Sequence, residues 1–193
     1  NMELTQNPSV LELVRKTAEL TTPKEIVWID GSEAQLESLR KIAVETGELI
    51  KLNEEKLPGC YLNRSDVNDV ARVEGRTFIC SRTREEAGPT NNWMDPDEMK
   101  AKLHEILRCA MAGRTMYVIP YSMGVIGSPF AKYGIEVTDS IYVVLNMAIM
   151  TRIGTKVLDA LGDSSDVILG VHSKVTLDPE NRYIVHFPEE NKI

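Results

Sequence analysis

The sequence is poor in the residues that mark disulfide-bonded proteins, zinc proteins and membrane proteins. Its three cysteines are widely spaced without a CxxC pair, and it has only three histidines. Isolated cysteines in odd number argue against a disulfide framework or a thiolate zinc site and are typical of the reducing cytoplasm. The longest apolar run, around residues 141–150, falls short of the roughly 20 residues of a membrane span, and no cationic, apolar leader is found. We therefore expect a cytoplasmic protein with no membrane partner.

The chain also lacks an excess of cationic residues. Asp and Glu outnumber Lys and Arg by 29 to 22, which gives a net charge of −7. Nucleic-acid binding needs clustered cations to contact phosphates, so this composition argues against a nucleic-acid partner. A small anionic substrate remains compatible with it, because one arginine can dominate the potential of its own pocket.

Signatures of nucleotide and metal binding are missing too. The turn at residues 31–32 has one glycine, whereas the dinucleotide fingerprint needs three at fixed spacing. The turn at residues 122–129 holds glycines and hydroxyls, but a Gly-Lys-Ser/Thr phosphate loop occurs nowhere. His104, His172 and His186 have no metal-like spacing, and we interpret them as structural or surface histidines.

What the sequence does contain is a series of short strand-like and amphipathic helix-like segments. The predicted helices cover residues 10–19, 33–46, 96–112, 140–152 and 155–161. The predicted strands cover residues 24–30, 49–52, 70–81, 115–120, 166–173 and 182–187. Strand, helix and strand over residues 24–52 indicate a βαβ-type unit, and a turn at 178–181 joins the last two strands. The predicted fold class is α/β, a single mixed-sheet domain with flanking helices.

The densest block runs from residue 114 to 155. It holds a strand, a turn with Gly124 and Gly127, and an apolar helix, and Thr138-Asp139-Ser140 reads most simply as the cap of that helix. We expect this block to be core scaffold. We also expect the cysteines (Cys60, Cys80 and Cys109) to be packing residues, because none has a nearby activating partner.

Two residues suggest a binding site. Arg72 and Glu74 lie two apart on the predicted strand 70–81, so their side chains should project from the same face. Arginine pairs bidentately with carboxylates and phosphates, which makes Arg72 a candidate clamp for an anionic substrate. From spacing alone, an exposed ion pair of little energetic value is the more frequent arrangement. The polar loop at 82–93 is long enough to suggest function or mobility.

Four blocks of the chain resemble the N-terminal part of GTP-dependent phosphoenolpyruvate carboxykinase. They are SDVNDVARVEGRTFICS (65–81), NNWMDP (91–96), GRTMYVIPYSMGVIGSPFAKYGIEVTDSIYVV (113–144) and IMTRIGTKVLDALGD (149–163). The likeness is dense from Ser65 to Asp163 and looser elsewhere. Long ungapped blocks of this kind are far more specific than a short motif.

The resemblance implies an enzyme that interconverts oxaloacetate plus GTP with phosphoenolpyruvate, carbon dioxide and GDP in gluconeogenesis or anaplerosis. It assigns substrate binding to Arg72 and Glu74, and it implies a divalent metal (Mn²⁺ or Mg²⁺) and GTP for the full-length enzyme, held by residues beyond position 193. Residues 1–193 would then be its N-terminal, substrate-contacting domain, inactive without the C-terminal nucleotide and metal domain.

An alternative function is a stand-alone, non-catalytic domain, derived from that enzyme, that binds small anions or a protein partner. Two departures from the family pattern are visible in the sequence. Tyr121 stands where phenylalanine is expected, and Ala148 stands where arginine is expected. The second change could remove a salt bridge or a contact to the C-terminal domain.

Overall fold

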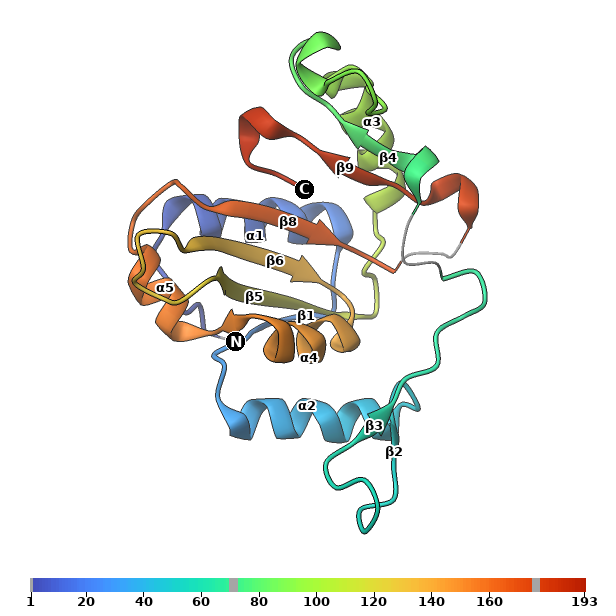
Figure 1. Cartoon of the computed structure of the whole chain (residues 1–193), viewed down its shortest axis with the longest axis vertical. Helices are drawn as coiled ribbons and strands as arrows, with labels where there is room; N and C mark the ends of the chain where they lie inside the picture. The colour runs from blue at the N-terminus through green and yellow to red at the C-terminus, as the bar shows by residue number, and fades with distance from the viewer. Residues whose placement is uncertain (1, 70–72, 175–177) are drawn as a thin grey trace.

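A five-stranded mixed sheet forms the centre of the computed structural model, which describes residues 2–69, 73–174 and 178–193 (Figure 1). Its strands, in spatial order, are β1 (Glu25–Trp28), β5 (Thr115–Met123), β6 (Lys132–Thr138) and β8 (Ile168–His172), with the short β7 (Arg152–Ile153) beside the second half of β5. β5 runs parallel to β1 and antiparallel to β6, and β6 runs parallel to β8. The predicted fold class, an α/β domain with a mixed sheet and flanking helices, is confirmed.

Helix α1 (Pro8–Thr21) covers one face of this sheet. Its N-cap Asn7 accepts hydrogen bonds from the amides of Ser9 and Val10, which otherwise lack a partner at a helix start. The four positions predicted at helical spacing are all buried: Val10, Leu13, Val14 and Thr17. The apolar ones pack on β5 and β6 together with Leu158 and Leu161 of α5 (Thr155–Leu161).

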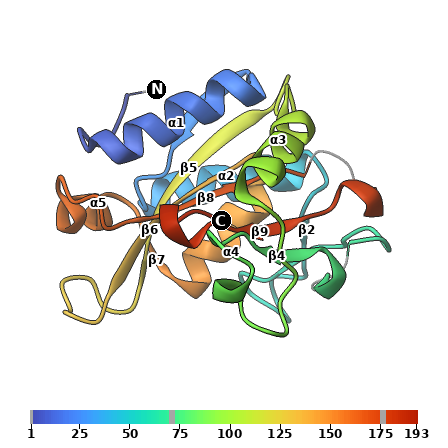
Figure 2. The same cartoon turned by 90° about the horizontal axis from the view of Figure 1, so that it is seen from above.

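Helices α2 (Glu33–Glu45) and α4 (Ile141–Met150) form the layer on the opposite face, and Figure 2 shows α1 and α4 on opposite sides of the strands. Ser32 and Ser140 cap these helices, as the sequence predicts for both. α4 is apolar nearly all round because it lies between the sheet and α2. Ile42 of α2 lies at the same helical spacing as the buried Leu39 and Ala43 but is 42% exposed.

A smaller apolar cluster joins α3 (Pro96–Leu107) to a two-stranded parallel sheet of β4 (Thr77–Ile79) and β9 (Ile184–His186). This part stands above the main sheet in Figure 1. Asp95 caps α3 with Pro96 in its first turn, as predicted. The buried members of the cluster are Cys80, Met99, Val185 and Phe187.

One prediction about strand pairing is wrong. β2 (Ile50–Lys51) does not form a βαβ unit with β1; it pairs antiparallel with β3 (Tyr61–Leu62), which was not predicted. The two closing strands predicted at 166–173 and 182–187 belong to different sheets, because β8 pairs with β6 in the main sheet and β9 pairs with β4. In each case the true partner lies far away in the sequence or is only two residues long.

The strand β6 was also missed, although it makes the longest ladder of the sheet with β5. Its sequence does alternate, with Tyr133, Ile135 and Val137 on one face and the less strand-like Gly134 and Glu136 on the other. Both have a structural reason. A side chain at Gly134 would overlap the ring of Tyr121, and the Glu136 carboxylate occupies the space that a side chain at Gly170 would need.

The cysteines divide between core and surface. Cys80 is buried, as predicted, whereas Cys60 and Cys109 are exposed, so the prediction that they pack in the core is wrong. None forms a disulfide bond. No helix in the described part of the chain is long and apolar enough to cross a membrane.

Glu136 is a largely buried carboxyl group in the middle of β6. Burial raises its pKa from 4.5 to about 7, and no ion pair is formed by it among the described residues. The folded state therefore binds this proton more tightly than the unfolded chain does, and stability falls as the pH rises between those two values.

We expect Glu136→Gln to stabilise the protein at pH 8 by on the order of 3 kcal/mol and to have little effect at pH 4, because glutamine mimics the protonated carboxyl group. Thermal unfolding at both pH values measures the difference. Glu45→Gln, at the exposed end of α2, is the control. An equal gain at both pH values would contradict the buried charge as the cause.

Candidate functional site

The strand predicted at residues 70–81, which was to carry Arg72 and Glu74, begins later in the described structure. Arg72 lies outside the described residues. Glu74 begins a three-residue 3₁₀ helix, η1 (Glu74–Arg76), and the strand β4 starts only at Thr77. The prediction that Glu74 projects from a strand is therefore wrong. Gly75 explains it, since glycine weakens a strand and is tolerated in a tight turn.

Glu74 is exposed, and its main chain is held from two directions. Its carbonyl oxygen accepts a hydrogen bond from the amide of Thr77 and a second one, 2.8 Å long, from the side-chain amide of Asn92. Arg76, two residues later, contacts other partners. Its Nη2 lies 2.7 Å from Oε2 of Glu180, its Nη1 donates to the hydroxyl of Tyr183, and its guanidinium lies over the ring of that tyrosine. The η1 turn is thus fixed to both the 82–93 loop and the segment before β9.

A hydrogen-bonded group surrounds Asp139 at the carboxyl ends of β6 and β8. The Asp139 carboxylate is fully buried and accepts three hydrogen bonds: from Nη1 of Arg114 at 3.0 Å, from Oγ of Ser173 at 2.9 Å and from the amide of Lys174 at 3.0 Å. Lys174 also pairs through Nζ with Glu48 at 3.0 Å. We call Arg114, Asp139, Ser173 and Lys174 the Asp139 cluster.

The sequence reading missed this cluster. It assigned Thr138-Asp139-Ser140 to helix capping, which is right for Ser140 alone. An aspartate between a strand and an N-cap serine was the available signal, but nothing in the sequence reveals that Arg114 and Ser173 flank it. A buried charge needs several donors to offset its desolvation, and here they come from the start of β5 and the end of β8.

His172, the last residue of β8, lies beside this cluster. Its Nδ1 is 2.7 Å from the hydroxyl of Thr138. Burial lowers the pKa of His172; the carboxylates of Asp139 and Asp69 act in the opposite direction, while Lys174 adds to the lowering.

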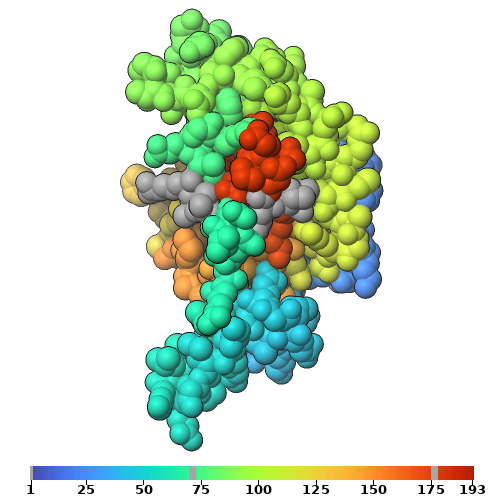
Figure 3. All heavy atoms as spheres, turned by 90° about the vertical axis from the view of Figure 1, so that its right-hand side faces the viewer, coloured from blue at the N-terminus to red at the C-terminus, as the bar shows by residue number. Residues whose placement is uncertain are grey.

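The described segment before Arg72 crosses the same end of the sheet. Figure 3 looks onto this end, and the teal residues run up across it toward the red C-terminal part of the chain. A guanidinium nitrogen of Arg182 donates to the carbonyl oxygen of Asn68, which joins the two segments. Of the described residues near the predicted clamp, Asn68 is therefore joined to Arg182, and Glu74 is joined to Asn92 beside β4.

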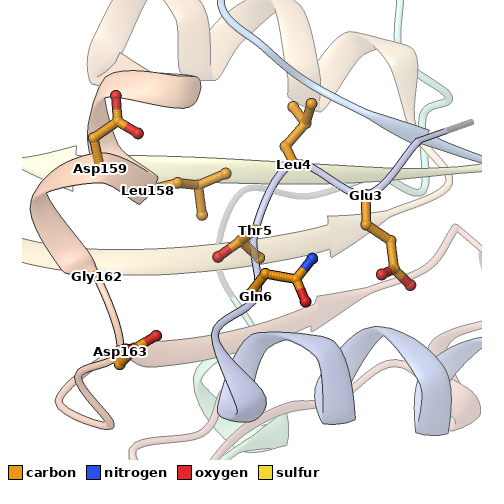
Figure 4. Close-up of a pocket in the computed structure, with 8 residues that line it drawn as sticks. All are labelled: Glu3, Leu4, Thr5, Gln6, Leu158, Asp159, Gly162 and Asp163. Carbon is orange, nitrogen blue, oxygen red and sulfur yellow. The ribbon is translucent and has the colours of Figure 1, made fainter.

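A shallow cleft of about 420 Å³ lies elsewhere, between the N-terminal segment and α5 (Figure 4). Three carboxylates line it (Glu3, Asp159 and Asp163) and no Lys or Arg does. This lining does not suit an anionic substrate. It contains neither Glu74 nor a member of the Asp139 cluster.

No metal site is formed by the residues that the structure describes, because no three His, Cys, Asp or Glu side chains among them converge. A phosphate loop is missing from the sequence as well. The described residues therefore do not fit a bound divalent metal or GTP.

Comparison with known proteins identifies the family. The model of the phosphoenolpyruvate carboxykinase N-terminal domain matches residues 12–193. The chain belongs to this family. It is 52% identical over 98% of its length to phosphoenolpyruvate carboxykinase (GTP) of Anaeromyxobacter dehalogenans strain 2CP-C, 49% identical over 97% to that of Neocallimastix frontalis and 46% identical over 98% to that of Corynebacterium jeikeium strain K411. It spans about a third of the length of these relatives, 32%, 33% and 33% respectively.

The two residues expected from the sequence to depart from the family pattern, Tyr121 and Ala148, lie on one face of the sheet. Tyr121 is half-buried with its ring against Gly134, and burial, with a smaller contribution from Glu136, raises the pKa of its hydroxyl. Ala148 packs with the apolar residues that join α2 and α4 to the sheet. The prediction that Ala148 removes a salt bridge stays a prediction.

Asp139→Ala should destabilise this carboxykinase domain by about 3 kcal/mol, because three donors lose a buried acceptor. Urea unfolding followed by circular dichroism measures the change. Glu180→Ala, which breaks an exposed pair with Arg76, is the control and should cost less than about 1 kcal/mol. Equal costs for the two variants would contradict the importance of the buried cluster.

Proposed function

We propose that residues 1–193 act as the N-terminal, substrate-contacting domain of a longer GTP-dependent phosphoenolpyruvate carboxykinase. The reaction converts oxaloacetate and GTP to phosphoenolpyruvate, carbon dioxide and GDP. The observation that carries this proposal is the family match over residues 12–193, together with 46–52% identity to relatives that bear this name. Such identity over nearly the whole chain favours the enzyme over a stand-alone binding domain.

Arg72 is the residue proposed to bind the carboxylate of the substrate, with Glu74 shaping the same site. Loss of carbon dioxide from oxaloacetate leaves the electron pair of the broken C–C bond on an enolate, whose oxygen then takes the γ-phosphoryl group of GTP. A fixed guanidinium would hold the dianionic substrate in place for both steps. The hydrogen bond from Asn92 to the main chain of Glu74 supports a fixed position for this second residue of the proposed site.

Nucleotide and metal chemistry belong, in this proposal, to the two thirds of the relatives that the chain does not span. GTP and a divalent cation would supply the phosphoryl group and its charge neutralisation there. The free cysteines support the reducing cytoplasm as the compartment.

A chimeric enzyme tests the proposal. This chain would replace the matching third of the Anaeromyxobacter dehalogenans enzyme, and GTP-dependent decarboxylation of oxaloacetate would be followed by the release of phosphoenolpyruvate. We expect the chimera to be active within about tenfold of the parent, because the two segments are 52% identical. The isolated chain should show no turnover. A folded, monodisperse chimera without activity would contradict the proposal.

Arg72→Ala in this chimera should raise the KM for oxaloacetate by about 10²-fold, since a charge-assisted bidentate contact contributes roughly 3 kcal/mol. The KM for GTP and the melting temperature should hardly change. Arg64→Ala, eight residues earlier and exposed, is the matched control. Unaltered kinetics in Arg72→Ala would contradict its role as a substrate clamp.

A further inference from the structure

Asn92 lies in the NNWMDP block, to which the proposed function assigns no role. It is at the end of the 82–93 loop and forms an isolated parallel bridge with Phe78. Its carbonyl oxygen accepts a hydrogen bond from the amide of Ile79 at 2.9 Å. The main chain of Asn92 is thus docked on the free edge of β4, and its side chain starts from a fixed position.

The side-chain amide of Asn92 reaches across to the η1 turn. Its Nδ2 donates to the carbonyl oxygen of Glu74 at 2.8 Å and to that of Thr77 at 3.0 Å. These two carbonyls bracket the turn, one at its first residue and one directly after its last. One amino group with two hydrogens satisfies both, which only Asn or Gln can do as a neutral side chain.

The η1 turn has little support of its own. A three-residue 3₁₀ helix has poor hydrogen-bond geometry, and this one contains Gly75. Its internal bonds run from the amides of Arg76 and Thr77 to the carbonyls of Val73 and Glu74, and the Thr77 hydroxyl adds one more to Val73. The two bonds from Asn92 tie the main chain of the turn to a separate segment, whereas the side chain of Arg76 ties it to Glu180 and Tyr183.

We propose that Asn92 is a positioning residue that sets the orientation of Glu74 in the substrate site, and that substrate affinity depends on its side-chain amide. The inference rests on the proposed function, since Glu74 matters only if it shapes that site. Asn92 does not touch the reacting atoms. It acts through the main chain of Glu74, two residues from the proposed clamp.

Three variants of the chimeric enzyme test this role. Asn92→Ala removes both donors, and Asn92→Asp keeps the shape but places a carboxylate against two carbonyl oxygens. Asn91→Ala is the matched control: the neighbouring asparagine donates its amide to the carbonyl of Ala87 at 2.7 Å and does not contact η1. Both sites are exposed, so folding should be retained in all three variants.

We expect the KM for oxaloacetate to rise about three- to tenfold in both Asn92 variants, as expected for the loss of one or two hydrogen bonds. The KM for GTP should stay constant, and Asn91→Ala should match the unmodified chimera. Hydrogen exchange over residues 73–79 should be faster in the Asn92 variants. A general loss of stability would instead reduce the amount of active enzyme and leave both KM values unchanged.

The outcomes separate the two proposals. An inactive but folded unmodified chimera would overturn the proposed function and the role of Asn92 with it. An active chimera whose KM for oxaloacetate is the same in Asn92→Ala, Asn92→Asp and the unmodified protein would overturn the role of Asn92 alone. The same follows if Asn91→Ala raises this KM as much as Asn92→Ala does.

Discussion

The need of β5 for partners along its whole length governs the rest of the structure. It is the longest strand, buried through most of its length, and its backbone groups must be paired on both sides. β6 pairs along one side, while β1 covers the first half of the other side and β7 the second. Pro120 lies between these two partners, where its missing N–H leaves no donor unpaired, and its carbonyl accepts from Gly154 at 3.0 Å.

The change of partner along β5 brings two turns into close contact. Asp30 and Gly31, which follow β1, cross the end of β7 at Ile153 and Gly154. A side chain at either glycine would overlap the backbone of the other turn, and both have positive φ angles of 80° and 107°. Gly31, which is no part of a dinucleotide fingerprint, is thus explained by packing.

At the opposite end of the sheet, the contacts are made by charged and polar groups instead of apolar side chains. β6 and β8 end there with their carboxyl termini, and Asp139 is buried where α4 begins. Its three donors join the start of β5 to the end of β8, so these two strand ends are held together. Separately, Asn92 holds the main chain of Glu74 beside the smaller β4–β9 sheet.

The local elements followed from the sequence because their causes are local. The caps Asn7, Ser32 and Asp95 and the spacing of apolar residues were enough to find all five helices. The family could be recognised from long blocks because identity over many consecutive residues does not depend on knowing the contacts. These features predict the α/β class and a carboxykinase-like domain.

The tertiary structure alone decided the pairing of strands and the surroundings of the site. β1 pairs with β5, about ninety residues later, and β4 pairs with β9, more than a hundred residues later. No local sequence pattern predicts pairings at such separations. Glu74 lies in a turn and not in the predicted strand, because Gly75 and the side-chain amide of Asn92 stabilise that turn. Likewise, Asp139 could be read as a cap from sequence, but only folding brings Arg114, Ser173 and Lys174 to it. Hydrogen bonds between residues close in sequence determine helices and turns. A buried charge or a strand edge needs a partner from a distant segment, and only the tertiary structure shows which segment supplies it.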